Sequence, residues 1–485
     1  MERSITRNLM YNLLLQVVTL VLPLITVPYT SRILGADGIG IYSFTLSITQ
    51  YFIIFGTLGL SMYGNRQIAY IRDDKVRMSK TFWSIFFLRT ITSGIAILLY
   101  YIIFSKVAIY KEIYMIQMLN IIAATLDISW LYMGIEDFKK VVIRNLLVKI
   151  IGVGLIFTFV NSSRDLKLYV FINVLMLLIG NALMWAYLSS TVVKVKIKLK
   201  DISVHLVPSI KLFIPQIAIQ IYAVLNKTML GAFSNVEQLG YYEQADKIIQ
   251  TVLGLVTALG IVMLPRMSNI FAKGDTKSMN NYLNSSLAWV AYISVPITIG
   301  VAGISYEFVP WFFGNSFESA KYIIIALAPI LYLIAMSNVM GMQYLTPANR
   351  IKEFTVSVIC GAVINVIINL ILIPKIHAIG TCVATIMAEF SVTAVQCFCL
   401  RQEINIKQYL NLFAKYVFAA VIMFAVVRII GMTMGIKIIT TIVQSIIGAI
   451  VYIMILIMLR EKNNEILLSY IFDKIRAIQI KNKII

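Results

Sequence analysis

The stretch TSRILGADGIGIYSF, residues 30–44, ends one long apolar run with an arginine and opens the next through three glycines. A similar stretch, TMLGAFSNVEQLGYYEQ, occupies residues 228–244. The Leu-Gly-Ala triplet at 34–36 recurs at 230–232, an offset of 196 residues, whereas Gly40 recurs as Gly240, an offset of 200. A four-residue insertion reconciles the two offsets, and the second one also places Arg66 on Arg266. The chain is therefore predicted to contain an internal repeat.

The composition is that of an integral membrane protein. Of the 485 residues 60% are hydrophobic and only 13% are charged, and the mean hydropathy is +0.86. A bilayer core of roughly 30 Å needs about 20 apolar residues per helix, and such segments recur along the chain. About fourteen spans are expected. They lie near 9–29, 40–63, 82–104, 113–134, 141–160, 168–189, 211–232, 245–265, 287–309, 319–345, 354–373, 379–400, 412–432 and 438–459.

The breaks between these spans leave no room for a separate soluble domain. None exceeds about 25 residues, which is below the usual size of a domain. The first span begins close to Met1 without the small-residue cleavage pattern of a secretory signal, so it is expected to be retained. The function is therefore predicted to reside within the helical bundle.

The repeat predicts the domain organisation. Six spans separate the two copies, an even number, so both copies run in the same direction and form a parallel repeat. Transporters built from two repeats usually bind their substrate between the lobes. The expected parts are an N-lobe at 1–190, a basic cytoplasmic linker at 191–210, a C-lobe at 211–402, two further helices at 403–460 and a basic cytoplasmic tail at 461–485.

The formal net charge of +20 is mostly a topology signal. With the N-terminus inside, the even-numbered loops and both tails hold about 28 lysines and arginines against about 9 on the opposite side. The positive-inside rule then places both termini in the cytoplasm, and the charge does not indicate nucleic-acid binding. The run KVKIKLK at 194–200 is either a solvated linker or a contact with anionic lipid head groups.

The cysteines and histidines do not suggest a metal site. Cys360, Cys382, Cys397 and Cys399 all fall within apolar spans and form no CxxC pair, and the two histidines, in loops, are isolated. Neither a metal nor a cofactor is therefore expected.

Ionisable residues inside the spans are the main candidates for function, because a charge in hydrocarbon is costly and normally faces the bundle interior or a wet cavity. Arg89 lies about seven residues, roughly 10 Å, into its span and is the leading cavity candidate. Arg144 and Arg428 lie nearer span ends and are expected to snorkel or to face phosphates. The remaining members of this set are Asp127, Lys149, Lys227 and Glu389.

Helical spacing groups some of these residues. Asn120 and Asp127 are expected on one face of the fourth span, and Asn145 and Lys149 share a face of the fifth. Asp127 and Lys149 would then lie in the same half of the membrane, either as a structural ion pair or with a role in substrate or proton binding. Glu389 shares a face with Thr385 and Gln396, which serves either lobe packing or coupling.

The repeat also pairs cations between the lobes. At the offset of 196, Arg32 aligns with Thr228, next to Lys227, so each lobe has a cation near the outer end of its first span. Arg66 and Arg266 repeat the pattern at the inner side, where interfacial anchoring is the simpler explanation. Cations distributed through a central cleft would attract an anionic head group and offer it successive partners.

Several stretches in this order resemble the oligosaccharide flippase (polysaccharide transport, Wzx-like) family of the MOP superfamily, which includes multidrug and toxin extrusion (MATE) proteins and lipid II flippases. The resemblance covers nearly the whole chain. It rests on SRILGADGIGIYSF at 31–44, MGIEDFKKVVIRNLLVKI at 133–150, YAVLNKTMLGAFSNVEQLGYYEQADKI at 222–248, VMLPRMSNIFAKGD at 262–275, SNVMGMQYLTP at 337–347 and NVIINLILIPKIHAIGTCVATIMAEF at 365–390.

The resemblance implies an all-α, MATE-like fold of two six-helix lobes plus two C-terminal helices around a cationic cavity. It implies alternating-access transport, not catalysis, of an undecaprenyl-pyrophosphate-linked oligosaccharide across the bacterial cytoplasmic membrane, for capsule, O-antigen or a related polymer. Lipid and a polysaccharide polymerase complex are the expected partners, and a monomer is the default. Asn226 stands beside Lys227 where family members often have an acid, so a coupling carboxylate is not transferred there, and the energy source, an H⁺ or Na⁺ gradient or the membrane potential, stays open.

The candidate site residues therefore fall into three groups. The substrate-binding cations are Arg32, Arg89, Lys149 and Lys227; the coupling or ion-pair candidates are Asp127 and Glu389; and the polar cavity candidates are Asn120, Asn145, Asn226, Asn365 and Asn369.

Three other functions are weighed against a flippase. A cation-coupled multidrug exporter of the same fold would need an acid-rich cavity, whereas the charges within the spans are mostly basic. A membrane-embedded polymerase or ligase would need catalytic residues on a sizeable outer loop, and no outer loop is long. A scaffolding role would leave the buried charges unexplained.

Overall fold

The computed structural model describes residues 2–107, 109–272, 275–461 and 463–465, except for the side chains of 2–21, 214–219, 221–223, 258–269 and 271–272. Within these ranges the chain is helical almost throughout and has no β-strand. It divides into two compact units, Met1–Glu243 and Gln244–Ile485, which are described separately. The side chain of Arg266 and most of the predicted basic tail, 466–485, lie outside the described residues.

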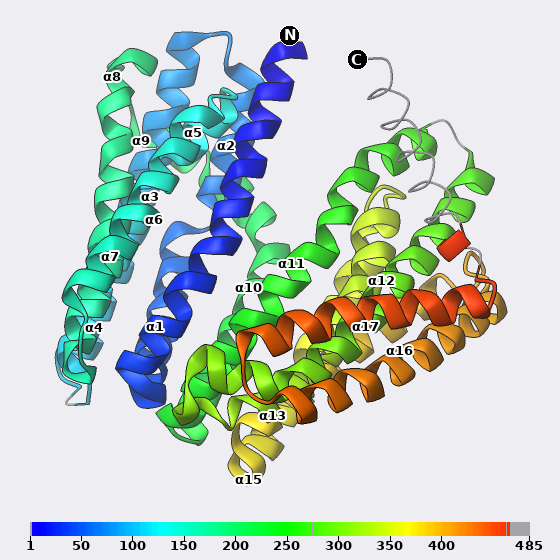
Figure 1. Cartoon of the computed structure of the whole chain (residues 1–485). Helices are drawn as coiled ribbons and strands as arrows, with labels where there is room; N and C mark the ends of the chain where they lie inside the picture. The colour runs from blue at the N-terminus through cyan, green and yellow to red at the C-terminus, as the bar shows by residue number, and fades with distance from the viewer. Residues whose placement is uncertain (1, 108, 273–274, 462, 466–485) are drawn as a thin grey trace, which may run out of the picture. The chain divides into compact units, whose positions relative to one another are not determined.

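The first unit consists of long apolar helices joined by short turns. Helices α3, α4, α6 and α7 run alongside one another in it, and α1 packs against α3, α4, α6 and α10 (Figure 1). Its helices are α1 (Glu2–Thr57), α2 (Leu60–Ile71), α3 (Lys75–Phe104), α4 (Lys111–Leu126), α5 (Ser129–Gly134), α6 (Phe138–Phe159), α7 (Leu166–Leu183), α8 (Leu188–Thr191), α9 (Leu199–Ser203), α10 (Leu206–Phe233) and the first turns of α11 (Val236–Ala272).

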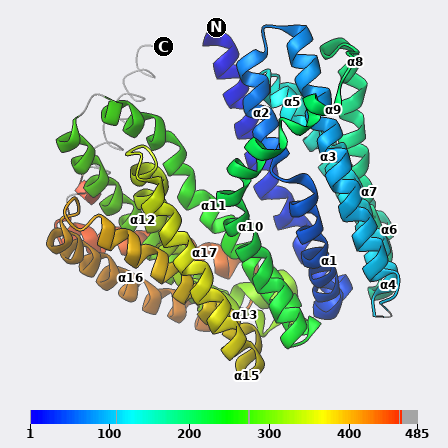
Figure 2. The ribbon, with the colours of Figure 1, turned by 180° about the vertical axis from the view of Figure 1, so that it is seen from behind.

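The second unit repeats this style of packing. Helices α12, α16 and α17 pack against one another, and α15 packs against α13 and α14, as Figure 2 shows from behind. Its helices are the rest of α11, α12 (Thr276–Phe313), α13 (Ala320–Leu327), α14 (Pro329–Asn338) with a π-helical continuation at Val339–Leu345, α15 (Ile351–Cys399), α16 (Ile406–Met434) and α17 (Ile438–Met458).

The predicted membrane spans are present as helices. Ten described stretches are long and apolar enough to cross a bilayer. Ile351–Cys399 contains two predicted spans, and Leu22–Ile71 contains the end of the first and all of the second. Helices α10 and α11 coincide with the predicted seventh and eighth spans. The expectation of about fourteen membrane helices in a multi-pass protein is therefore confirmed for the described chain.

Two breaks separate consecutive spans that run together in one helix. Gly35 adopts φ 67° and ψ 179° within α1, a left-handed backbone that glycine reaches without steric cost, and it divides the first predicted span from the second. In α15 the break lies at Ile376 and His377, two residues after Pro374. His377 therefore lies between the two predicted spans at 354–373 and 379–400.

The fourth predicted span, 113–134, is not continuous, which corrects the expectation that Asn120 and Asp127 share one helix face. Helix α4 ends at Leu126, and Asp127 is extended (φ −70°, ψ 107°). Its Oδ1 accepts a hydrogen bond of 3.0 Å from the backbone N–H of Ser129, at the start of α5. An aspartate that satisfies a free N–H at a helix start favours a new helix over continuation of the old one.

Aromatic packing holds the breaks of the first unit in place. Trp130 of α5 is 1% exposed and stacks on Phe82 of α3 with ring centroids 5.4 Å apart. Leu60 and Ile68 of α2 are fully buried in the same cluster. This core fixes α2, α3 and α5 around the polar groups that the break at Asp127 exposes.

The two copies of the repeated stretch contact each other within the first unit. A side chain at Gly40 of α1 would collide with the carbonyl of Val236 in α11, and one at Gly240 would collide with the carbonyl of Ala36. Gly40 corresponds to Gly240, Val236 lies four residues before Gly240, and Ala36 lies four residues before Gly40, so the two contacts are geometrically equivalent. Ser43 hydrogen-bonds Glu243, its own counterpart 200 residues later. The starts of the two equivalent helices therefore meet in a local two-fold arrangement centred on Ser43 and Glu243.

Candidate functional site

A buried ion pair lies at the contact between α1 and α11. Lys227 Nζ of α10 is 2.8 Å from Glu243 Oε2 of α11, and Ser43 Oγ of α1 donates a 2.7 Å hydrogen bond to the same oxygen. The side chain of Glu243 is 9% exposed and that of Lys227 is 25% exposed. Helix α1 thus meets the consecutive helices α10 and α11 at one carboxylate, and we call Ser43, Lys227 and Glu243 the crossing triad.

Polar side chains surround the crossing triad. Tyr42 and Tyr169 pack edge to face with ring centroids 5.2 Å apart, and both lie within electrostatic range of Glu243. Thr228, next to Lys227, donates a 3.1 Å hydrogen bond to Ser47 Oγ, one turn beyond Ser43. Hydroxyl groups therefore continue along α1 on both sides of the ion pair.

The crossing triad alters the sequence-based interpretation of Lys227 and Asn226. Asn226 is buried, as expected of a polar residue facing the bundle interior. The carboxylate missing next to Lys227 in the sequence is supplied by Glu243, sixteen residues later. Glu243 falls between two predicted spans and so was missed, although its position opposite Ser43 in the repeat was already visible in the alignment.

The polar row on α1 extends toward α4, where Asn120 lies. Gln117 Nε2 donates to Thr45 Oγ1 at 3.5 Å, and Asn120 Nδ2 donates to Gln117 Oε1 at 2.5 Å. All three residues are buried. Asn120 is therefore joined to α1 through Gln117 and lies in the bundle interior.

Arg89 occupies a different polar centre, at the break between α4 and α5. It is 2% exposed, and its Nη1 donates to Ser61 Oγ at 3.1 Å and to the carbonyl of Asp127 at 3.0 Å. The carbonyl is available because α4 has ended. In this conformation Arg89 is enclosed and bound to the backbone rather than exposed to a cavity.

Arg144 belongs to the same centre. Its Nη1 donates a 2.6 Å hydrogen bond to Asn181 Oδ1, and Asn181 Nδ2 donates to the carbonyl of Ala123. Both Arg144 and Arg89 interact electrostatically with Asp127. Asp127 thus has two arginines as charge neighbours. Arg144 was expected either to snorkel or to face phosphates; in this structure its guanidinium is held by Asn181 instead.

The other predicted residues of the first unit are more open. Asn145 and Lys149 lie on α6, each partly exposed, with their spacing of one turn preserved. Arg32 is exposed on α1, three residues before the break at Gly35. Arg66 Nε donates to Tyr70 OH at 2.9 Å near the end of α2, a contact that suits anchoring.

In the second unit, Asn365 and Asn369 lie one turn apart on α15 and are both fully buried. Asn369 Nδ2 donates to Asn365 Oδ1 at 2.9 Å. Glu389 is partly exposed on the second half of α15, while Thr385 and Gln396 are buried. The two asparagines therefore form a polar position inside an otherwise apolar helix pair.

The second unit also contains an ion pair that the sequence analysis missed. Arg428 Nη1 of α16 lies 2.9 and 2.8 Å from the two carboxylate oxygens of Glu307 in α12, and Gln444 Nε2 of α17 donates to the same carboxylate at 2.9 Å. The guanidinium also lies 4.0 Å from the ring centroid of Tyr306. Arg428 was expected either to snorkel or to face phosphates; in this structure the buried Glu307 carboxylate holds it instead. A count of acids within the ninth span would have found Glu307.

No metal centre can be built from the described residues: within them, no group of three or more His, Cys, Asp or Glu side chains is placed to hold an ion.

Comparison with known proteins gives the family. The sequence profile of the family described as "Polysaccharide biosynthesis protein" matches residues 5–271, more than half of the chain. The protein belongs to the polysaccharide biosynthesis protein family. The match contains α1 to α10 and most of α11, so it includes the crossing triad.

Similar proteins can be aligned with most of the chain. A protein of Escherichia coli (strain K12) named "Putative O-antigen transporter" is 24% identical over 405 residues, which cover 82% of this chain and 97% of that protein. A Shigella dysenteriae protein of the same name is 21% identical, covering 79% and 96%. A shorter match, 25% identical over 143 residues, is to the lipid II flippase MurJ of Bacillus subtilis, of which it covers 26%.

Solved structures show the same fold. The lipid II flippase MurJ in an inward closed conformation superimposes with a TM-score of 0.75 over 93% of this chain and 99% of that one, at 18% identity. An inward-facing MATE family transporter of the MOP superfamily superimposes with a TM-score of 0.54, covering 81% and 98%, at 12% identity. The predicted MATE-like fold is confirmed, and at these identities the likeness concerns the fold alone.

Proposed function

We propose that the protein is a flippase that carries an undecaprenyl-pyrophosphate-linked oligosaccharide repeat unit from the inner to the outer leaflet of the bacterial cytoplasmic membrane by alternating access. The observation that carries the proposal is the similarity to the Escherichia coli relative, which spans 97% of a protein named as an O-antigen transporter. The positive-inside pattern supports cytoplasmic termini. The proposed partners are the lipid-linked substrate, surrounding lipid and a polysaccharide polymerase complex, with the protein acting as a monomer.

The chemistry of the substrate explains why buried polar groups are needed. A pyrophosphate and a chain of sugars cannot cross hydrocarbon unaided, because stripping water from charges and hydroxyls without replacing those hydrogen bonds is prohibitive. Lysine, tyrosine, serine and threonine side chains around the crossing triad supply such replacements. We assign the anionic group of the substrate to Lys227, whose side chain is the more exposed member of the pair.

Substrate binding at Lys227 requires that Glu243 release it. A buried carboxylate left without its cation is costly unless it takes up a proton. We therefore propose that pyrophosphate displaces Glu243 from Lys227 and that Glu243 is then protonated, with Ser43 retaining a hydrogen bond to it. This exchange favours an H⁺ gradient as the energy source over a Na⁺ gradient or the membrane potential alone.

A cation-coupled multidrug exporter of the same fold is the second candidate. The buried carboxylate of Glu243 is the observation that favours it, since a drug exporter needs an acid in its cavity. The adjacent Lys227 weighs against it, because a cationic drug would be repelled by the group that neutralises this acid. Export of a cationic dye by cells that express the protein, blocked in Glu243→Gln, would favour the exporter.

The flippase is tested in its host. Deleting the gene is expected to abolish a surface polysaccharide and to accumulate lipid-linked repeat units on the cytoplasmic side. Wild-type protein should restore the polymer, and Lys227→Met, at the same membrane abundance, should not. An unchanged surface polysaccharide after deletion would overturn the substrate assignment.

A further inference from the structure

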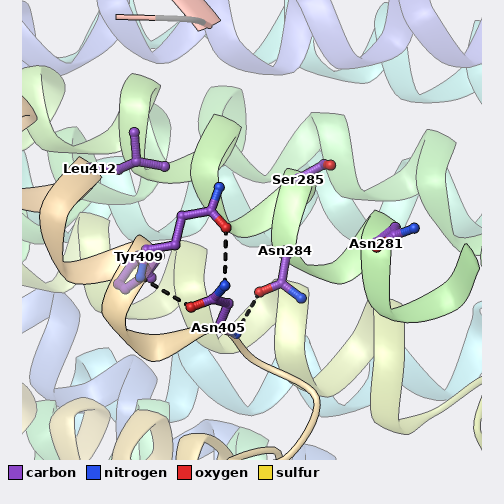
Figure 3. Close-up of a pocket in the computed structure, with 7 residues that line it drawn as sticks. Asn281, Asn284, Ser285, Asn405, Tyr409 and Leu412 are labelled. Atoms are coloured by element: carbon purple, nitrogen blue, oxygen red, sulfur yellow. Dashed lines mark hydrogen bonds between the residues drawn. The ribbon is translucent and has the colours of Figure 1, made fainter. Parts of the chain in front are cut away.

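A pocket in the second unit lies well away in sequence from the crossing triad. It opens between the first turns of α12 and α16 and has a volume of about 310 Å³, within the range of small-ligand sites (Figure 3). Figure 3 shows that one wall comes from α12 and the other from the turn before α16 and its first turns. Its polar lining consists of Asn281, Asn284, Ser285, Asn405, Gln408 and Tyr409.

One part of this lining is rigid. Asn284 Nδ2 donates to the carbonyls of Asn280 and Glu403, and its Oδ1 accepts a 2.8 Å hydrogen bond from the backbone N–H of Asn405. Asn405 in turn caps α16, where its Oδ1 accepts from the N–H of Gln408. The two helix starts are therefore tied together, and the pocket keeps its shape without a ligand.

The Tyr409 ring is also held. Its hydroxyl lies 2.5 Å from the hydroxyl of Tyr332 and 3.4 Å from Met336 Sδ. The ring and the neighbouring Leu412 add an apolar surface to the amide-rich lining. A ligand in this pocket would meet fixed amides on one side and a fixed aromatic ring on another.

The other part of the lining has hydrogen-bonding capacity to spare. Among the described residues, Asn281 and Ser285 make no side-chain hydrogen bond, and Gln408 uses only its Oε1, which accepts from Asn405 Nδ2. Asn281, Ser285 and Gln408 are all exposed. Two carboxamides and a hydroxyl, which can both donate and accept, thus face a preformed hollow.

The chemistry of the lining selects a neutral, hydroxyl-rich ligand. Among the residues that the structure describes, no charged side chain lines the pocket, so a phosphate or a carboxylate would lack the charge-assisted partner that such anions require. Sugar hydroxyls both donate and accept, as carboxamides do, and the C–H face of a sugar ring suits an aromatic surface. We propose that this pocket binds a sugar ring.

Two molecules could present that sugar: the carried lipid-linked unit, through its saccharide, or a membrane glycolipid, through its headgroup. In the first case the site rests on the proposed function. The positive-inside pattern assigns the starts of α12 and α16 to the cytoplasmic side, where the sugar of an unflipped unit would lie. The chemistry of recognition is the same for both.

Saturation-transfer NMR on the full-length protein in phosphatidylglycerol nanodiscs tests the site, with N-acetylglucosamine as the probe and glycerol 3-phosphate as the anionic comparison. Transfer to the sugar is expected, and none to glycerol phosphate. Asn281→Leu and Gln408→Leu should each weaken the sugar affinity about fivefold, as expected for one lost hydrogen bond. Gln402→Leu is the matched control, since Gln402 is an exposed carboxamide in the same turn that does not line the pocket.

Absence of transfer in the wild type, equal transfer in Gln408→Leu, or equal transfer to glycerol phosphate would overturn the sugar site. Adding a glucosyl diacylglycerol to the nanodiscs separates the sources: loss of the soluble-sugar signal assigns the site to a glycolipid, and its persistence assigns it to the carried saccharide. Lys227→Met should leave this binding unchanged, so failure of the proposed function and failure of the sugar site are distinguishable.

Discussion

At the scale of single residues, Lys227 and Glu243 are the pair on which the proposed mechanism depends. Each is held within hydrogen-bond distance of the other on helices joined by a two-residue turn, and Ser43 fixes the carboxylate from a third helix. Removing one member of such a pair costs more than the pair contributes, because the remaining charge stays buried. The ion pair can therefore stabilise the carrier without substrate. In the proposed mechanism an anionic substrate takes the place of Glu243 beside Lys227.

Glu243→Gln tests the carboxylate directly. The amide keeps the shape and the contact with Ser43 but cannot neutralise Lys227 or carry a proton. We expect the flipping rate to fall at least about tenfold, since one charge-assisted hydrogen bond is worth about 1.5–3 kcal/mol. The rate is measured on purified protein in proteoliposomes. Glu318→Gln, in the exposed pair with Lys321, is the control and should change little; a wild-type rate in Glu243→Gln would remove Glu243 from the mechanism.

Arg428 and Glu307 are expected to stabilise the second unit rather than to transport. Arg428→Met leaves the Glu307 carboxylate buried with only Gln444 as a partner and should cost about 3–5 kcal/mol. Adding Glu307→Leu removes the stranded charge and should recover most of that loss. Thermal unfolding of the two variants and the wild type in one detergent measures this. A double variant less stable than Arg428→Met would contradict the buried-charge explanation.

At the scale of elements, the contact between α1 and α11 depends on two glycines from equivalent positions of the repeat. Ala at position 40 or 240 would place a methyl group against the backbone carbonyl of Val236 or of Ala36, and a backbone cannot swing aside as a side chain can. The two helices are therefore too close at this point to admit any side chain at position 40 or 240.

Gly240→Ala should separate the two helix starts and break the hydrogen bond between Ser43 and Glu243. We expect less monodisperse protein after purification and a lower midpoint of thermal unfolding. Gly94→Ala is the matched control: a methyl group there meets nothing within 4 Å, and alanine favours a helix by about 1 kcal/mol. Equal behaviour of the two variants would show that the close approach is dispensable.

The linker before α10 carries the expected pH dependence. His205 Nδ1 is 2.8 Å from Tyr63 OH, and burial lowers the pKa of His205, an effect that Asp201 partly opposes. A histidine kept neutral by the fold stabilises it fully above its unfolded pKa of about 6.5, and this contribution is lost as the pH falls below that value. The thermal midpoint should therefore drop between about pH 7.5 and about pH 5.5.

His205→Gln, which cannot titrate, should show a smaller drop across the same interval. The pKa of Asp201 is lowered by its pairing with Lys80, so its contribution is lost only in more acidic solution, below the ordinary aspartate range. An identical drop in His205→Gln would assign the pH dependence to other groups.

Hydropathy and charge patterns were sufficient for the elements, but not for the partners of the buried charges. A span such as 287–309 can be read from apolar length alone, because hydrocarbon admits few alternatives to a helix. The break at Asp127 was not predicted, since an aspartate that accepts a backbone N–H at the start of the next helix cannot be told from other polar residues in a span. Which residue faces Lys227 or Arg428 depends on helix rotation and packing, which one sequence does not specify.

At the scale of the whole molecule, about fourteen membrane spans in the described chain and membership of the polysaccharide biosynthesis protein family indicate a carrier rather than a catalyst. The repeat is visible in the structure as well as in the sequence. Its two copies pack against each other through equivalent glycine contacts, and Ser43 of one copy hydrogen-bonds Glu243 of the other. Lys227, to which we assign the anionic group of the substrate, therefore lies where the two copies of the repeat contact each other.

The most direct test is to reconstitute the purified protein into proteoliposomes that contain an undecaprenyl-pyrophosphate-linked oligosaccharide and to follow its digestion by a membrane-impermeant glycosidase. Wild-type protein should bring the inner-leaflet fraction to the enzyme over time, while Lys227→Met should leave only the outer-leaflet fraction digested. Digestion that stops at the outer-leaflet fraction with folded wild-type protein, with or without a proton gradient, would contradict the flippase assignment.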